Sequence, residues 1–574
     1  MADPTLDALF ALLVEQKVSD ENIASLKKVV ADGGDLYEEI VSKKILPEET
    51  LAQAWATALQ IPYVDLHGVD IAREVLQIIP ESTAREHSII AYQHATDQVQ
   101  VAMADPRDRQ IVEFIQKKVD KPVTIAQTSR ASIREGLALY QESLDTELQQ
   151  ILSTVGAVAV SGDDLSKAAE DLPVVRTVDL LLKHAILQDA SDIHIEPTET
   201  TVVIRYRVDG ILHDMLTLPR DFLAGLIARI KVLSNLKIDE HRLPQDGRFK
   251  IETEDYKIAF RVSILPVYDG EKVVMRLLDE SGKGLDLSSI GLRSTALEVM
   301  RRNISKPHGM VLVTGPTGSG KTTTLYAALK ELNTPEVNIS TVEDPIEYRM
   351  PRINQTQVNP KIGLTFSNGL RSLVRQDPDI LMVGEIRDEE TAALAVNAAL
   401  TGHLVLSTLH TNSAAGALPR LLDMEVEAFL LASTVNVLVA QRLVRRLCEE
   451  CHEMTAIGAD MIKDLEHVVD ASQLTALLEK EDLLKKGESL SKLKVGTPGS
   501  CSVCNDGYKG RMGIYEVIEF SDELRPAITS TISSQELERL AREQQDMTSM
   551  VEDGLIKVAQ GLTSVEEVLR VAKE

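Results

Sequence analysis

The sequence predicts a multidomain α/β protein whose core is a doubly wound parallel sheet. Between residues 290 and 446, short apolar segments alternate with stretches long enough for helices, which is the pattern of parallel strands joined by crossover helices. The chain of 574 residues also exceeds the size of a single hydrophobic core, and at roughly 150 residues per domain about four domains are expected. The core strands are expected at 310–314, 338–342, 379–383 and 403–408.

Residues 1–145 are expected to form a helical bundle followed by a small α/β module. Leu6, Leu9 and Leu13 recur at helical spacing near the start, and apolar and polar residues alternate further along. The polar, acidic stretch 146–173 is expected to be a linker. Within the module, strands are expected at 88–92, 99–103 and 123–126.

Residues 174–289 are expected to form an α+β unit. A helical pattern at 178–186 precedes two segments with strand alternation, 202–210 and 257–263. The unit is rich in arginines beside turns, and each of them taken singly would be read as a solvated surface charge. These arginines are Arg205, Arg207, Arg242, Arg248, Arg261 and Arg276.

The stretch 315–322 follows the apolar segment 310–314 and precedes a helical pattern, so the order is strand, glycine-rich loop, helix. Phosphate binding needs this layout, because glycines let backbone N–H groups converge on phosphate oxygens while the helix N-terminus adds a positive partial charge. Lys321 is expected to reach the β- and γ-phosphates and Thr322 to hold Mg²⁺, so the chain is expected to bind a nucleoside triphosphate. The expected contacts are Gly315, Pro316, Thr317, Gly318, Ser319, Gly320, Lys321, Thr322 and Thr323.

Acidic residues and a histidine follow other core strands. Hydrolysis needs an acid that organises the metal and a group that aligns the attacking water. Glu343 and Glu385 are the candidates, since both stand at strand ends where α/β sheets bind ligands, whereas Asp344 and Asp388 fit helix caps. His410 ends a neighbouring strand and is expected on the γ-phosphate side of the site.

The cysteines form two C-x-x-C pairs in a region expected to be a separate subdomain, 447–516, which is followed by helices at 517–574. Each pair suits a knuckle that places both sulfurs on one tetrahedral Zn²⁺, whereas a redox dithiol would need one pair only. A structural zinc site is therefore expected. Its four ligands are Cys448, Cys451, Cys501 and Cys504.

The charge balance bears on the partners of the protein. Lys and Arg number 61 against 88 Asp and Glu, which gives 61 − 88 = −27, and this field repels polyanions. No nucleic-acid partner is expected. The N-terminus has no basic region and no stretch approaches the ~18 apolar residues that span a bilayer, so the protein is expected to be cytosolic.

The segments 315–322, 341–347, 383–388 and 402–411 resemble the Walker A motif, Asp box, Walker B motif and His box of the secretion-superfamily ATPases. The resemblance is to the type IV pilus assembly (PilB-type) and type II secretion (GspE-type) branch, and the 174–289 unit is similar to the pre-ATPase domain of that family. It implies a RecA-like P-loop core preceded by a PAS-like α+β domain. It also implies that ATP and Mg²⁺ bind at the core and Zn²⁺ at the cysteines.

The same resemblance implies a homo-hexameric motor in the cytoplasm, peripheral to the inner membrane and in contact with it only through protein partners. ATP hydrolysis would turn an inner-membrane platform protein, which loads pilin subunits during type IV pilus assembly. A type II secretion ATPase is the nearest alternative, and a nucleic-acid translocase is the alternative from another class. In the N-terminal region, the arginine-leucine-glycine start of the family's cyclic di-GMP motif is missing.

The resemblance further implies that Lys321 and Thr322 hold phosphate and Mg²⁺, and that Glu343 and Glu385 share the water-polarising and metal roles, with Glu385 also at the magnesium. Which glutamate is the general base stays open. The outer side of a γ-phosphate is open to a neighbouring subunit, where guanidinium groups suit the developing charge. The first choices for this role in trans are Arg207 and Arg248.

Overall fold

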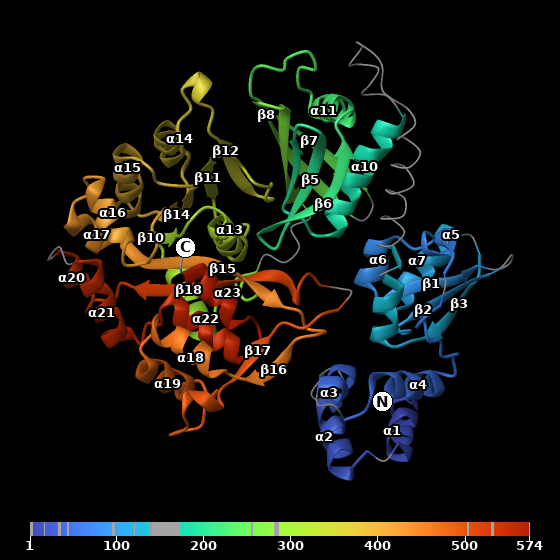
Figure 1. Cartoon of the computed structure of the whole chain (residues 1–574). Helices are drawn as coiled ribbons and strands as arrows, with labels where there is room; N and C mark the ends of the chain where they lie inside the picture. The colour runs from blue at the N-terminus through green and yellow to red at the C-terminus, as the bar shows by residue number, and fades with distance from the viewer. Residues whose placement is uncertain are drawn as a thin grey trace. The chain divides into compact units, whose positions relative to one another are not determined.

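The computed structural model divides into two compact units, Met1–Leu277 and Leu278–Glu574 (Figure 1). No helix among the described residues is long and apolar enough to cross a bilayer. The structure describes residues 4–16, 18–31, 36–42, 45–69, 71–94, 98–119, 121–137, 139–140, 172–253, 256–280, 286–501, 504–529 and 533–572.

The first unit begins with short helices that pack around one apolar core. Leu9 and Leu13 are fully buried and Trp55 is 7% exposed, so the helical spacing of the apolar residues places them on inward faces. The predicted helical bundle is confirmed. Its helices are α1 (Pro4–Glu15), α2 (Asp20–Ala31), α3 (Leu36–Ser42) and α4 (Glu48–Leu59).

A three-stranded sheet follows, in the order β1-β2-β3, with β1 and β2 antiparallel and β2 and β3 parallel. Each of the three strands predicted for this module is present. The predicted linker 146–173 lies outside the described residues up to 171, and its last two residues begin a helix. The elements are α5 (Arg73–Leu76), α6 (Glu81–Glu86), β1 (Ile89–His94), β2 (Val99–Met103), α7 (Arg109–Val119) and β3 (Val123–Gln127).

The rest of the first unit is a six-stranded sheet in the order β6-β5-β4-β9-β8-β7. The apolar residues of its strands, such as Tyr206 and Phe260, share a core with the apolar faces of two helices, so one face of the sheet is covered by helices. The helices are α10 (Leu172–Leu187) and α11 (Phe222–Leu233). The strands are β4 (Asp192–Pro197), β5 (Thr201–Val208), β6 (Ile211–Pro219), β7 (Gln245–Glu252), β8 (Lys257–Val267) and β9 (Gly270–Asp279).

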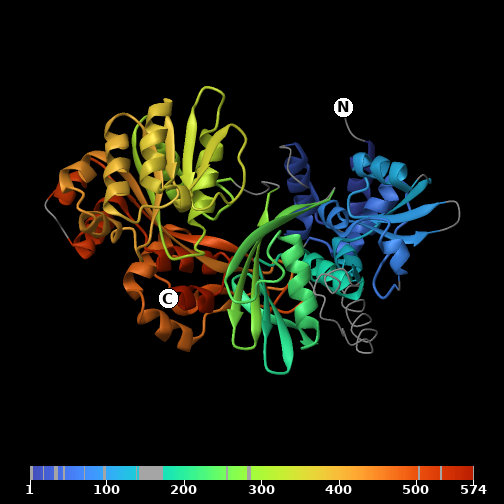
Figure 2. The same cartoon turned by 90° about the horizontal axis from the view of Figure 1, so that it is seen from above.

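The second unit, coloured from yellow-green to red in Figure 2, is organised around a seven-stranded sheet in the order β12-β11-β13-β14-β10-β15-β18. The strands are parallel except β18, which pairs antiparallel with β15. The four predicted core strands are present, whereas β12, β15 and β18 were not predicted. The strands are β10 (Gly309–Thr314), β11 (Ile339–Glu343), β12 (Ile353–Gln357), β13 (Ile380–Val383), β14 (Leu404–Leu409), β15 (Val435–Leu447) and β18 (Tyr508–Glu519).

Both faces of this sheet are buried. Met310 and Leu312 of β10 belong to one apolar core, and Val311 and Val313 of the same strand belong to another, so successive side chains feed cores on opposite faces. The prediction of a doubly wound sheet is confirmed. The helices around it are α12 (Ser294–Ile304), α13 (Lys321–Leu332), α14 (Phe366–Leu373), α15 (Glu389–Leu400), α16 (Ala417–Asp423) and α17 (Ala428–Thr434).

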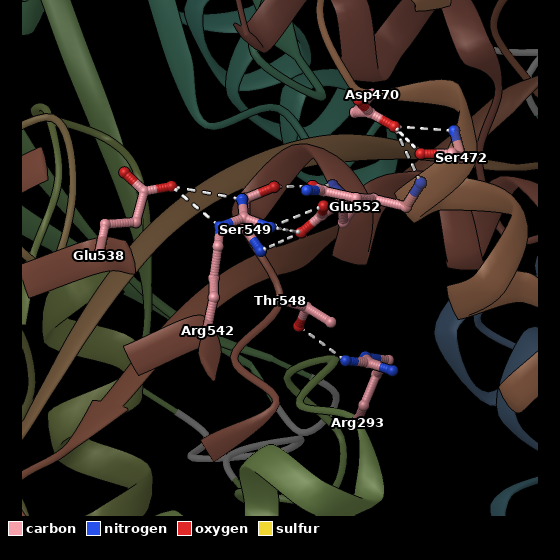
Figure 3. Close-up of polar contacts among 9 residues, drawn as sticks. Arg293, Asp470, Ser472, Glu538, Arg542, Thr548, Ser549 and Glu552 are labelled. Carbon is pink, nitrogen blue, oxygen red and sulfur yellow. Dashed lines mark hydrogen bonds and ion pairs between the residues drawn. The ribbon is translucent and has the colours of Figure 1, made fainter. Parts of the chain in front are cut away.

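The last part of the second unit holds the remaining elements, and polar contacts tie two of its C-terminal helices together. Arg542 lies between the carboxylates of Glu538 and Glu552, and Glu552 forms a capping box with Ser549, while Arg293 reaches Thr548 (Figure 3). These contacts fasten the last helices to one another and to the start of α12. The elements are β16 (Glu453–Ala456), α18 (Ala459–Glu466), α19 (Ala471–Lys480), β17 (Lys494–Thr497), α20 (Arg525–Thr529), α21 (Ser534–Gln545), α22 (Met550–Ala559) and α23 (Val565–Ala572).

Candidate active site

A glycine-rich loop joins β10 to α13 and carries the predicted phosphate contacts. Gly315, Gly318 and Gly320 have φ angles of 149°, 80° and 86°. A β-carbon at Gly315 would lie 2.5 Å from the backbone oxygen of Gln441, and one at Gly320 would lie 2.8 Å from the side-chain nitrogen of Gln441. The loop needs glycine at both positions because β15 approaches its backbone closely.

The atoms of this loop fit an anion. Lys321 begins α13, so the unpaired N–H groups and the positive end of the helix dipole lie at the loop. Its ammonium donates hydrogen bonds of 2.9 Å to the backbone oxygens of Gly315 and Pro316. Among the described residues, the buried hydroxyl of Ser319 has no hydrogen-bond partner. A phosphate would supply the acceptors that these donors lack.

The other predicted contacts lie on the same turn. Thr317 and Gly318 are exposed at its tip, Thr322 is half-buried in the first turn of α13, and Thr323 is exposed beside it. The hydroxyl of Thr324, one residue further, is already taken, since it donates to the side-chain oxygen of Gln441 at 2.7 Å.

The charge of Lys321 is poorly solvated. Burial lowers the pKa of Lys321 to about 8; nearby Glu385 opposes this shift, and nearby Arg442 adds to it. A bound polyanion would stabilise the ammonium, so the pKa of Lys321 is expected to rise when phosphate binds.

Glu385 and His410 come together beyond the ends of β13 and β14. Nε2 of His410 lies 3.2 Å from Oε2 of Glu385, and Nε of Arg387 lies 2.6 Å from the same oxygen. Because β13, β14 and β10 are parallel neighbours, these residues and the glycine-rich loop all lie at the carboxyl ends of the strands. His403, at the start of β14, instead places Nδ1 2.9 Å from the backbone oxygen of Ala398, so it serves the turn after α15.

Glu343 ends β11 as predicted, but its carboxylate is enclosed by its own chain. The residue is 2% exposed and accepts hydrogen bonds from the hydroxyls of Tyr326 and Thr341 and from Nε2 of Gln355. Burial raises the pKa of Glu343, although these hydrogen bonds oppose the shift. The carboxylate of Glu385 is therefore the more open of the two candidates.

Two pairs of residues at the site were not predicted. The hydroxyl of Thr314, the last residue before the glycine-rich loop, lies 2.7 Å from that of Thr411, and Nη2 of Arg442 donates to Oδ1 of Asn412 at 3.3 Å. Arg442 is 7% exposed. The signal in the sequence was the polar pair Gln441 and Arg442 inside the otherwise apolar stretch 437–444 of β15.

The predicted arginines of β5, β7, β8 and β9 lie on the face of the six-stranded sheet opposite its helix-covered core, because the residues that alternate with them belong to that core. Arg242 lies instead in the exposed loop before β7. Arg207 lies 3.6 Å from Asp192 and donates to the backbone oxygen of Gly210. Arg248 is exposed and pairs directly across the strands with Arg261. Like charges directly opposite one another on neighbouring strands repel.

The four cysteines form one cluster, as predicted. Their sulfurs lie within 4.8 Å of one another, and the sulfurs of Cys448 and Cys501 are 3.8 Å apart. Four thiolates on one tetrahedral zinc, with bonds of ~2.3 Å, have sulfurs ~3.8 Å apart. The antiparallel pairing of Leu447 with Tyr508 brings the two knuckles together although a long insert separates them in sequence. The donor set and spacing fit a structural zinc ion.

The family model described as "Type II/IV secretion system protein" matches residues 167–570, and the model described as "MshEN domain" matches residues 59–147. The chain is 40% identical over 547 residues to the type IV pilus assembly ATPase PilB of Myxococcus xanthus, covering 94% of both chains. It is 39% identical over 572 residues to the type II secretion system protein E of Xanthomonas campestris, covering 98% of both.

Among solved structures, the ATPase DotB of Yersinia pseudotuberculosis is similar in fold, with a TM-score of 0.50 and 21% sequence identity over 70% of this chain and 94% of that chain. The predicted fold class, a RecA-like P-loop core preceded by an α+β unit and followed by a cysteine-bearing and helical module, is confirmed by the observed sheets, the cysteine cluster and the matched family model.

Proposed function

The chain belongs to the type II/IV secretion system protein family and is an ATPase, and from this we propose that it is the motor that drives type IV pilus assembly. The observation that carries the proposal is the meeting of Lys321, Glu385 and His410 at one edge of the sheet, in a chain similar along most of its length to a pilus assembly ATPase. ATP hydrolysis at this edge would supply the mechanical work.

The glycine-rich loop would hold the triphosphate. Lys321 would exchange its two backbone acceptors for oxygens of the β- and γ-phosphates, and the orphaned hydroxyl of Ser319 would gain an acceptor. Thr322 and Glu385 would hold Mg²⁺, which neutralises the charge that develops on the phosphates. The helix dipole of α13 favours the same negative charge.

Glu385 is the better candidate for the general base. Both of its contacts, with Arg387 and His410, use Oε2, so Oε1 can accept a proton from the attacking water. Glu343 would have a structural role, since its carboxylate holds Tyr326 of α13 and Gln355 of β12 in place. In this assignment Glu343 shapes the site and Glu385 takes part in the reaction.

The active form would be a homo-hexamer in which arginines of one subunit reach the nucleotide of the next. Arg207 and Arg248 share the face of their sheet that lies opposite α10 and α11, and guanidinium groups suit an anionic ligand. Guanidinium groups supplied in trans would stabilise the charge of the transition state.

Zinc at the four cysteines would hold the end of β15 to the start of β18 and so stabilise the insert between them. The motor would work in the cytoplasm against an inner-membrane platform protein, through which it would act on the pilin machinery and reach the membrane.

A type II secretion ATPase is the second candidate, because the similarity to protein E of Xanthomonas campestris spans 98% of both chains. The ATPase site would be the same in both kinds of motor, and only the platform protein and the cargo would differ. A nucleic-acid translocase is disfavoured by the net charge of −27.

Glu385→Gln tests the site. The variant is expected still to bind ATP with Mg²⁺ but to lose about 10²-fold or more in kcat, because the amide cannot take the proton from water. Glu343→Gln is the matched comparison. It is expected to lower the melting temperature, since it disturbs three buried hydrogen bonds, but to change kcat little at temperatures where the variant stays folded. Near-normal turnover by Glu385→Gln would contradict the assignment.

A further inference from the structure

Glu516 is a buried carboxylate for which the hydrolysis described above has no use. It lies on β18 and is 4% exposed. Leu409, Thr314, Ala440 and Glu516 occupy one row across the neighbouring strands β14, β10, β15 and β18. Residues in such a row share a face of the sheet, so Glu516 lies on the same face as the residue that precedes the glycine-rich loop.

The loop after β14, residues 410–416, crosses this row. At one end the backbone N–H of Thr411 donates to the hydroxyl of Thr314 at 2.8 Å. At the other end the N–H of Ala414 donates to Oε1 of Glu516 at 2.9 Å, and the N–H of Ala415 also hydrogen-bonds this carboxylate. The loop that begins with His410 is thus fastened at both ends.

We propose that Glu516 is a positioning residue for ATP hydrolysis, because its carboxylate holds the 410–416 loop so that His410 stays against Glu385. The inference rests on the proposed role of Glu385 and His410. Without the acceptor, the amides of Ala414 and Ala415 would lie in an apolar core with no partner, and the loop would have to move to satisfy them. A displacement of ~1 Å at a reacting group can cost up to ~10²-fold in rate.

The electrostatics of the site give this role a measurable signature. Burial raises the pKa of Glu516 to about 7, helped by Glu538 and opposed by the amides of Ala414 and Ala415 and by Arg542. Glu538 and Arg542 belong to α21, where Arg542 also binds Glu552 (Figure 3). An ionised carboxylate accepts N–H bonds about twice as strong as those of a neutral acceptor, so the loop is held more firmly above pH 7 than below it.

The test compares Glu516→Leu and Glu516→Gln with a matched control, Glu519→Gln. Glu519 lies on the same strand, but its carboxylate binds Arg302 and Asn303 of α12 rather than the loop. Steady-state ATPase rates, nucleotide affinity, thermal stability and amide exchange of peptides covering 410–416 are measured for each variant at pH 6 and pH 8.

At pH 8, Glu516→Leu is expected to lower kcat about tenfold with KM for ATP unchanged within about twofold, and to speed exchange in the 410–416 peptides. Glu516→Gln keeps a neutral acceptor, so it is expected to lower kcat about three- to fivefold at pH 8 and to match the wild type at pH 6, where Glu516 is largely protonated. Glu519→Gln is expected to leave kcat and its pH dependence unchanged.

A wild-type kcat in both Glu516 variants would overturn the proposal, as would a ratio of wild-type to Glu516→Gln rates that is the same at pH 6 and pH 8. If Glu516→Leu fails to fold, the pH dependence of kcat in Glu516→Gln alone tests the proposal. Lys321→Ala separates this inference from the proposed function. If Lys321→Ala is inactive while the Glu516 variants have normal activity, only the role of Glu516 is refuted. If Lys321→Ala is active, the assignment of the ATPase site is refuted.

Discussion

Nucleotide binding is predicted to draw a proton from solvent onto Lys321. Burial holds the pKa of this lysine at about 8 in the free protein, well below the usual value for an ammonium. The two acceptors that the ammonium has are backbone oxygens of Gly315 and Pro316. When phosphates replace them, the opposite charge is expected to return the pKa of Lys321 to 10.5 or above.

The size of the uptake follows from this shift. With a pKa of about 8, the free protein has about half of its Lys321 groups unprotonated at pH 8 and about nine tenths at pH 9. Nearly all are protonated in the complex. Binding is therefore expected to take up about 0.5 proton at pH 8 and about 0.9 at pH 9, a range in which the γ-phosphate is already ionised.

The assay is calorimetric titration with a slowly hydrolysed ATP analogue and Mg²⁺ in buffers of different ionisation enthalpy. Lys321→Ala is expected to show an uptake near zero. Lys330→Ala is the control, because Lys330 lies on the same helix but is exposed and paired with Asp286 at 3.1 Å, and it is expected to behave like the wild type. Equal proton uptake in wild type and Lys321→Ala would refute the reasoning.

Two further predictions concern the metal and the assembly. Protein purified without chelator is expected to hold about one zinc per chain, and Cys448→Ser with Cys451→Ser is expected to lose the metal and to speed amide exchange within 445–516 while ATP affinity stays unchanged; elemental analysis without zinc would contradict this. Separately, the double variant Arg207→Ala, Arg248→Ala is expected to be inactive alone but to recover part of the ATPase activity when mixed with inactive Lys321→Ala, because mixed rings contain some interfaces with both elements intact. Full activity of the double variant alone, or no recovery on mixing, would contradict a role for these arginines at the nucleotide of a neighbouring subunit.

The core of the second unit was predictable because its signals are local. The apolar segments that became β10, β11, β13 and β14 are short, buried on both faces and bounded by turn residues, which is the pattern of central parallel strands. The glycine-rich loop was predictable for the same reason, since its chemistry resides in consecutive residues.

The extension of the sheet was not predictable in this way. The edge strand β18 joins β15 across the whole insert that separates the cysteine pairs, and such pairing depends on long-range packing rather than on local pattern. Arg442 and Glu516 reach the site only through these two strands. The polar pair Gln441 and Arg442 marks Arg442 in the sequence, but no local pattern places Arg442 or Glu516 at the site.

The contacts of the Glu343 side chain could not be predicted from the sequence either. Its position at the end of β11 was predictable, but its partners come from α13 and β12, and their approach is a property of the packed core. Glu385 has its contacts within a few residues of strand ends, so the motif alone was enough to single it out.

The most direct test of the proposed function is the effect of Lys321→Ala in the organism that carries this protein. The chromosomal variant, which lacks the ammonium for the β- and γ-phosphates, is compared with Lys330→Ala for surface pili by electron microscopy and for secreted proteins in the culture medium. Lys321→Ala cells are expected to lack pili while their secreted proteins are unchanged. Normal piliation of Lys321→Ala cells, with or without a loss of secreted proteins, would contradict the proposed function.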